Sequence, residues 1–170
     1  TGDVPWAGDV GPETRMRVQT EFKCRDAVTD VALTRDGRTL LCAAKDGGLS
    51  VFCLHLMRQV RRFTVGTLAL SSLAVLPPGT GPGPGPVVLA GSFDNCVYLV
   101  SADSGRVLQE LSLAHDDAVT CLALGPDAAA FVSGSWDCTV KLWALDKAGG
   151  ISRQAVGTLG EHDSAVAGVA

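Results

Sequence analysis

The chain has 170 residues, about the length of one ordinary domain, and 46% of them are apolar, which favours a packed core over general disorder. A net charge of −4, from 14 basic and 18 acidic residues, argues against a nucleic-acid-binding module, because such modules usually present a basic face. The longest uncharged run, 64–93, contains five prolines and so cannot form a membrane-spanning helix. We therefore expect neither nucleic-acid binding nor direct membrane insertion.

The cysteines and the N-terminus indicate an intracellular setting. No C-x-x-C pair occurs among Cys24, Cys42, Cys53, Cys96, Cys121 and Cys138, so the sequence offers no zinc or thioredoxin-like site. The first residues lack the basic and apolar regions of a secretory signal, and the absence of an initiating Met suggests a piece of a longer protein. We expect reduced thiols and a cytoplasmic location, with any membrane contact supplied by other parts of the parent protein.

One short motif recurs along the chain. The segment 26–33 (DAVTDVAL) returns almost unchanged at 117–124 (DAVTCLAL), with a weaker copy at 68–75 and a fourth that begins at 164. Downstream of the first three copies, an Asp in a turn of small residues precedes a large apolar residue by six positions. These pairs are Asp46 with Phe52, Asp94 with Val100, and Asp137 with Trp143.

The repeats predict the fold. Each unit has the pattern of four short strands, which in the third unit are expected at about 118–124, 129–134, 138–144 and 151–158. A four-stranded sheet repeated every 40–45 residues is a propeller blade, and adjacent blades must cover its two faces. The prediction is an all-β chain, a partial β-propeller of four-stranded antiparallel blades, with about three full blades plus edge strands.

The repeat boundaries also predict the domain organisation. Residues 1–23 are expected to be a linker and the last strand of a preceding blade, at about Met16–Phe22. Blades follow at 24–65, 66–114 and 115–161, and 162–170 is expected to be the first strand of a further blade. The Gly/Pro-rich stretch 77–86 of the second blade is predicted to be an exposed loop. Because the chain begins and ends within a blade, it resembles an arc cut from a larger propeller, with poor stability on its own.

The fullest unit resembles the WD-repeat family, which has a His before the first strand, an Asp in the turn after the second, and a Trp ending the third. The resemblance implies a structural hydrogen-bond network of His115, Ser133, Asp137 and Trp143. The other units depart from the pattern, because Cys24 and Gly66 stand at the His position and Phe52 and Val100 at the Trp position. Only the turn aspartates Asp46 and Asp94 are kept there, while His162 restores the His position in the incomplete fourth unit.

Three further stretches, 70–72, 93–98 and 115–119, resemble the C-terminal propeller of BEACH-domain proteins. That resemblance implies a non-catalytic adaptor in membrane-associated signalling or traffic, of the kind that couples a tumour necrosis factor receptor to neutral sphingomyelinase. The implied partners are other proteins, such as a receptor cytoplasmic tail or the remaining domains of the parent chain. In the WD family the residue before the turn Asp lies on the top face of the ring, which makes Lys45, Phe93 and Trp136 the candidate partner-binding residues.

Two other functions remain open at this point. The chain could be a purely structural propeller segment of another WD-repeat protein, or it could be a hydrolase. Catalysis has little support, because the chain lacks a G-x-S-x-G elbow and a phosphate-binding G-x-G-x-x-G. The adjacent carboxylates Asp116 and Asp117 would also point apart on an extended chain. We therefore expect no catalytic residue, no metal and no cofactor.

Overall fold

The computed structural model describes residues 20–81, 83–146 and 148–170, which form three four-stranded antiparallel sheets. The first blade comprises β1 (Val28–Leu33), β2 (Thr39–Ala44), β3 (Gly48–Cys53) and β4 (Arg58–Thr64). The second comprises β5 (Leu70–Val75), β6 (Val87–Ser92), β7 (Val97–Ser101) and β8 (Val107–Leu111). The third comprises β9 (Val119–Leu124), β10 (Ala130–Ser135), β11 (Thr139–Ala144) and β12 (Gly157–Glu161). The predicted all-β propeller architecture is confirmed.

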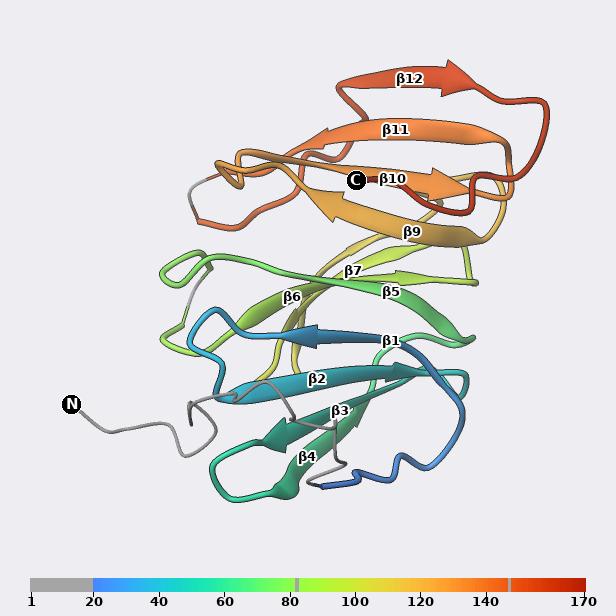
Figure 1. Cartoon of the computed structure of the whole chain (residues 1–170). Coiled ribbons are helices and arrows are strands. Elements are labelled where there is room, and N and C mark those ends of the chain that lie inside the picture. Colours follow the sequence, from blue (N-terminus) through green and yellow to red (C-terminus); the bar gives the residue numbers. More distant parts are fainter. Residues whose placement is uncertain (1–19, 82, 147) are drawn as a thin grey trace, which may run out of the picture.

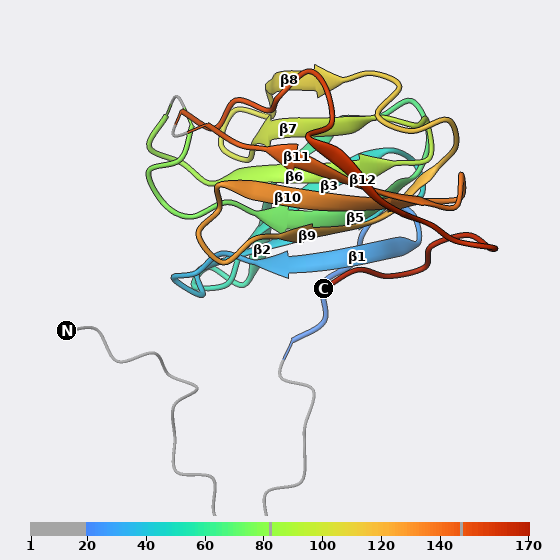
Figure 2. The ribbon, with the colours of Figure 1, turned by 90° about the horizontal axis from the view of Figure 1, so that it is seen from above.

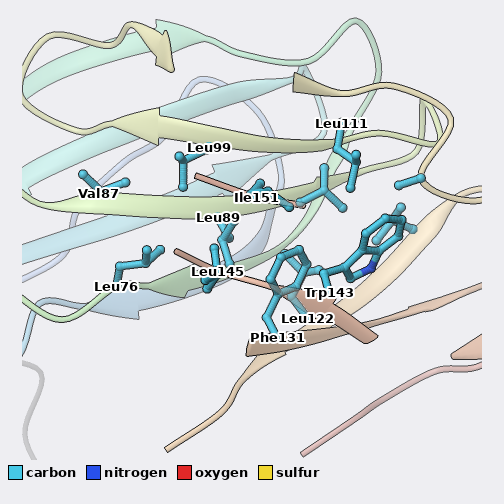
Figure 3. Close-up of a cluster of buried hydrophobic side chains, with 13 residues drawn as sticks. Leu76, Val87, Leu89, Leu99, Leu111, Leu122, Phe131, Trp143, Leu145 and Ile151 are labelled. Carbon is cyan, nitrogen blue, oxygen red and sulfur yellow. The ribbon is translucent and has the colours of Figure 1, made fainter. Parts of the chain in front are cut away.

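The three blades stack in chain order, with the second blade between the other two (Figure 1). Their first strands, β1, β5 and β9, lie side by side, as Figure 2 also shows from above. Buried side chains fill both spaces between the blades, and in the second space Phe131 and Trp143 of the third blade pack with apolar residues of the second (Figure 3). The alternation along each strand thus places one apolar row toward each neighbouring blade.

Equivalent side chains also connect the first strands by hydrogen bonds. The Leu73 backbone N–H donates to Asp30 of the first blade at 2.6 Å, and the Leu122 N–H donates to Ser72 of the second at 3.2 Å. Asp30 and Ser72 occupy the same place in their repeats. The repeat therefore encodes the polar connection between blades as well as the sheet.

The turn between β2 and β3 shows why glycine follows Asp46. Gly47 has a φ of +71°, in the left-handed region that favours glycine. A Cβ at Gly47 would also lie 2.4 Å from the carbonyl oxygen of Gly66. The chain that enters the second blade thus passes directly over this turn.

The last strand of the third blade differs from the expectation of 151–158. It begins at Gly157, and Ile151 forms only an isolated bridge with Leu145. The Ser152 N–H still donates to the Ala144 carbonyl at 3.0 Å, but the chain bends at 153–154 and interrupts the pairing with β11. The Gln109 side chain in β8 donates to the Ile151 carbonyl at 2.7 Å and accepts from its N–H at 2.8 Å. Residue 151 therefore pairs with the third blade and is also hydrogen-bonded to the second.

The edge strands predicted at the two ends of the chain do not form among the described residues. Residues 16–19 lie outside the described residues, and no strand forms over 20–22 or 162–170. The Val166 N–H nevertheless donates to the Ser135 carbonyl at 3.0 Å, and the Thr120 hydroxyl donates to the Val166 carbonyl. A further blade beginning at 162–170 stays a prediction.

The Gly/Pro-rich stretch forms the connection between β5 and β6, where the described residues 77–81 and 83–86 contain no strand. It lies at the end of the blades opposite the β6–β7 turn. Within the part of the chain that the structure describes, no helix is long and apolar enough to cross a membrane.

Candidate functional site

The third blade contains a continuous buried hydrogen-bond network. The Trp143 indole N–H donates to Ser133 Oγ at 2.8 Å, and Ser133 Oγ lies 2.6 Å from His115 Nε2. His115 Nδ1 lies 2.8 Å from Asp137 Oδ2, and the Thr139 hydroxyl donates to Asp137 Oδ1 at 2.7 Å. All four residues of the predicted network are therefore brought together, and Thr139 joins them.

The electrostatics of the network assign its protons. Burial lowers the pKa of His115, although Asp137 acts in the opposite direction, so the ring is neutral near pH 7. Against the effect of burial, hydrogen bonds from Thr139 and His115 lower the pKa of Asp137 to about 2. Since the carboxylate only accepts, Nδ1–H of His115 donates to it, and Nε2 accepts from the Ser133 hydroxyl. Each buried polar group is then satisfied, which makes the network structural.

The first blade fills the same positions with different chemistry. Cys24, Cys42 and Phe52 stand where the third blade has His115, Ser133 and Trp143, with identical spacings along the chain. Burial raises the pKa of the Cys42 thiol to about 12, and the neighbouring Cys24 thiol adds to this shift. Phe52 packs on Phe22, with ring centroids 4.9 Å apart. An apolar cluster thus replaces the polar network.

The turn Asp of the first blade has different partners as a result. Asp46 accepts the Gly48 backbone N–H at 3.0 Å and forms an ion pair with Arg62 of β4. A Cβ at Gly48 would lie 2.5 Å from the Arg62 guanidinium. The counterpart of Thr139 must therefore be small here for Arg62 to reach the carboxylate.

The second blade uses a third set of partners. Asp94 accepts from the Thr67 N–H at 2.9 Å and from the Tyr98 hydroxyl at 2.9 Å. Although burial opposes it, hydrogen bonds from Ser92, Thr67 and Tyr98 lower the pKa of Asp94. Each turn Asp is thus held in place by its own set of partners. Arg62, Tyr98 and Thr139 were not predicted as partners from the sequence. The polar Thr139, two residues after Asp137, was the one visible signal.

The turns after each second strand and the connections between blades lie on one surface, here called the top face. Backbone hydrogen bonds link the Phe93 N–H to the Ala69 carbonyl at 2.9 Å and the Trp136 N–H to the Ala118 carbonyl at 3.0 Å. The Lys45 N–H likewise donates to the Ala27 carbonyl at 3.0 Å. The three candidate binding residues therefore occupy equivalent places in three neighbouring turns.

Two of these three residues form a pair. Phe93 and Trp136 come from different blades, and their ring centroids lie 5.2 Å apart at an interplanar angle of 47°. Trp136 is 50% exposed, while Phe93 is half-buried. Lys45 is exposed, but it is not part of this aromatic pair. The pair forms an apolar platform across the junction of the second and third blades.

The described residues contain no group of three or more His, Cys, Asp or Glu side chains placed to bind a metal ion. An open groove lies between β8 and the loop before β12, lined by Gln109, Asp146, Arg153 and their neighbours. Gln109 is engaged with the Ile151 backbone there, and Asp146 accepts the Gly150 N–H at 2.7 Å. The Gln109 contact connects the second and third blades, and the Asp146 contact lies within the third.

Comparisons with known proteins identify the repeats. The family model "WD domain, G-beta repeat" matches residues 16–53 and 105–144. The periodic tryptophan protein 2 homolog of Neurospora crassa is 37% identical over 90 residues, which are 52% of this chain and 9% of that protein. Human striatin-4 is 38% identical over 61 residues, which are 36% of this chain and 8% of that protein. The chain therefore spans less than a tenth of the length of these relatives.

Solved structures agree on the fold. The structure of U3-55K superposes with a TM-score of 0.73 at 22% identity, covering 86% of this chain and 43% of that one. The crystal structure of the RRP9 WD40 repeats gives the same TM-score and identity and is covered to 42%. Two segments of the chain are thus similar to WD repeats, and the chain has the fold of WD40 propellers.

Proposed function

We propose that this chain is a protein-interaction scaffold, and that Phe93 and Trp136 are its main binding residues. The observation that carries the proposal is the half-exposed Trp136 ring, held against Phe93 on a rigid support of two blades. Large aromatic side chains are enriched among residues that dominate binding energy at interfaces. Binding residues also sit commonly on turns that a stiff framework positions.

The proposal does not require catalysis. The one buried histidine of the network, His115, is neutral and has both ring nitrogens engaged by Ser133 and Asp137. It is therefore occupied in holding the blade together. WD40 repeats are in general found in interaction scaffolds without catalytic activity, which agrees with this assignment.

A finer proposal rests on the motif resemblance to BEACH-domain proteins. In that setting the chain would be part of a cytoplasmic adaptor, peripheral to membranes, whose partner is a receptor cytoplasmic tail. The support is the three stretches 70–72, 93–98 and 115–119, of which 93–98 includes Phe93. Direct binding of the chain to the cytoplasmic tail of a tumour necrosis factor receptor tests this assignment, and no binding at high micromolar concentration would contradict it.

The experiment for the general proposal compares partner capture by the wild-type chain and by a Trp136→Ala/Phe93→Ala double variant. Partners are identified by quantitative crosslinking mass spectrometry in cells. We expect the double variant to lose at least tenfold in crosslinked partners while its circular dichroism stays unchanged. Leu159→Ala is the matched control, because Leu159 is exposed but lies on the outer strand β12. Unchanged capture by a folded double variant would refute the proposal.

A purely structural role is the second candidate, and exposed apolar residues on β1 favour it. Val28, Val31 and Leu33 are 48%, 56% and 57% exposed. Such a row is typical of a surface that another element covers. Sedimentation of the chain distinguishes the two, since a stable monomer with these side chains exposed would count against a structural role.

A further inference from the structure

The top face carries a marked separation of charge. The loops of the second and third blades on this face are 65–69, 93–96, 112–118, 136–138 and 162–166. Together they contain five aspartates and no lysine or arginine; the aspartates are Asp94, Asp116, Asp117, Asp137 and Asp163. One cation reaches these loops from β11, because the Lys141 ammonium donates to the Ala114 carbonyl at 2.9 Å. The corresponding loops of the first blade, 23–27 and 45–47, contain three basic and two acidic residues.

Three of these aspartates lie in segments that are hydrogen-bonded to the turn of Trp136. Asp116 and Asp117 directly precede Ala118, whose carbonyl accepts the Trp136 N–H at 3.0 Å. Asp163 lies in the segment that is tied to the same turn, because the His162 N–H donates to the Cys138 carbonyl at 2.8 Å. All three aspartates are exposed. The aromatic pair is therefore bordered by negative charge.

These carboxylates are available to a partner. Within the described residues, the Asp117 carboxylate accepts a hydrogen bond only from the N–H of Ala118, the next residue, at 2.7 Å, and its other oxygen accepts none. No hydrogen bond or ion pair to the side chain of Asp116 or Asp163 is found in the part of the chain that the structure describes. The other two aspartates, Asp94 and Asp137, accept hydrogen bonds from nearby residues and keep their negative charge.

We propose that this surface binds a peptide segment in which a lysine or arginine stands next to a large apolar side chain. The apolar side chain packs on the Phe93–Trp136 platform, and the cation lies between the exposed Trp136 ring and the carboxylates of Asp116, Asp117 and Asp163. A cation over an indole face and beside carboxylates gains from both the ring quadrupole and the opposite charge. The inference rests on the proposed function and adds the chemistry of the partner.

The basic residues of the first blade predict the direction in which a bound peptide lies across the blades. Lys23, Arg25 and Lys45 repel a cationic residue that lies over the first blade and attract an acidic one. A bound segment that crosses from the third blade toward the first should therefore carry its basic residue over the third blade. A nucleic acid is disfavoured at the platform, because phosphate groups would face the aspartates.

The test is a selection of random 12-residue peptides displayed on phage against the wild-type chain, with the triple variant Asp116→Asn/Asp117→Asn/Asp163→Asn as the counter-target. We expect enriched peptides to contain Lys or Arg adjacent to an apolar residue. The dissociation constant of the most enriched peptide, measured by fluorescence polarisation, should rise at least tenfold for the triple variant and for Trp136→Ala. It should also rise with added salt.

Asp103→Asn is the matched control, because Asp103 is also exposed but lies at the opposite end of the second blade, 3.8 Å from Arg61. Its dissociation constant should stay within twofold of wild type. Enrichment of acidic or uncharged peptides, or no enrichment over the triple variant, would overturn the inference. If the triple variant keeps its cellular partners and the Trp136→Ala/Phe93→Ala variant loses them, the scaffold function stands and the basic-peptide chemistry fails. If neither variant loses partners, both fail.

Discussion

The first and third blades share the same four-stranded backbone but differ in the side chains buried inside it. At positions with identical spacing, the third blade has His115, Ser133 and Trp143, and the first has Cys24, Cys42 and Phe52. In the third blade each polar group has a partner within the blade, whereas the first replaces most of these groups with thiols and a phenyl ring. The comparison teaches that the four-stranded sheet does not depend on one particular network, because the first blade forms it with thiols, a phenyl ring and an ion pair.

The two turn aspartates show how the replacement works. Asp137 is held by His115 and Thr139 from inside the blade, and its side chain is 9% exposed. Asp46 is held by Arg62 from the outer strand, and both side chains of that pair are 24% exposed. When the histidine is absent, a guanidinium supplies the missing donor. The third blade is therefore expected to depend more strongly on its polar contacts than the first.

The largest expected effect that separates the blades comes from His115→Ala. This substitution removes the acceptor of the Ser133 hydroxyl and one donor to the Asp137 carboxylate and opens a cavity, so the free energy of unfolding should fall by about 2–4 kcal/mol. Cys24→Ala at the equivalent position should cost under about 1 kcal/mol, because only part of a small apolar contact is lost. Equilibrium denaturation by urea measures both, and equal losses would show that the network adds nothing to the third blade.

The pH dependence of the free energy of unfolding should show the second-largest difference between the blades. The folded chain resists protonation of His115, whereas the unfolded chain takes up the proton at its ordinary pKa near 6.5. Stability contributed by the neutral ring is therefore present above about pH 6.5 and is lost as the pH falls below it. The Asp137 contribution is present above its unfolded pKa of 3.8 and is lost as the pH falls toward about 2.

Urea denaturation of wild type and His115→Gln between pH 7 and 5 checks the histidine contribution. The free energy of unfolding should fall less steeply with falling pH in the variant, because the contribution of His115 is gone. The exposed His55 and His162 remain in both proteins. Identical slopes for the two proteins would contradict this assignment.

The smallest effect is expected for Arg62→Ala in the first blade. An ion pair that is partly exposed on both sides contributes about 0.5–1 kcal/mol, and salt screens it. The loss of stability should therefore shrink as sodium chloride is raised from 0.05 to about 1 M. A loss as large as that of His115→Ala, or one independent of salt, would show that Arg62 is a full substitute for the buried network.

The sequence alone determined the repeat, the all-β propeller class and the positions of the turn aspartates. These features follow from local physics: strand alternation, turn residues and a fixed spacing are all written within a few residues of one another. It also placed His115, Ser133, Asp137 and Trp143 in one network through the family pattern. The start of the last strand of the third blade was predicted too early, because the bend at 153–154 that interrupts its pairing is not marked by a glycine or a proline.

Only the tertiary structure decided which contacts are made at each repeated position. The pairing of Asp46 with Arg62 depends on the register of β3 and β4, and the contact of Phe93 with Trp136 depends on how two blades pack. The acidic border of that platform arises because loops distant in sequence converge on one face. Such arrangements involve residues that the chain brings together only when the blades stack, so no local pattern could predict them.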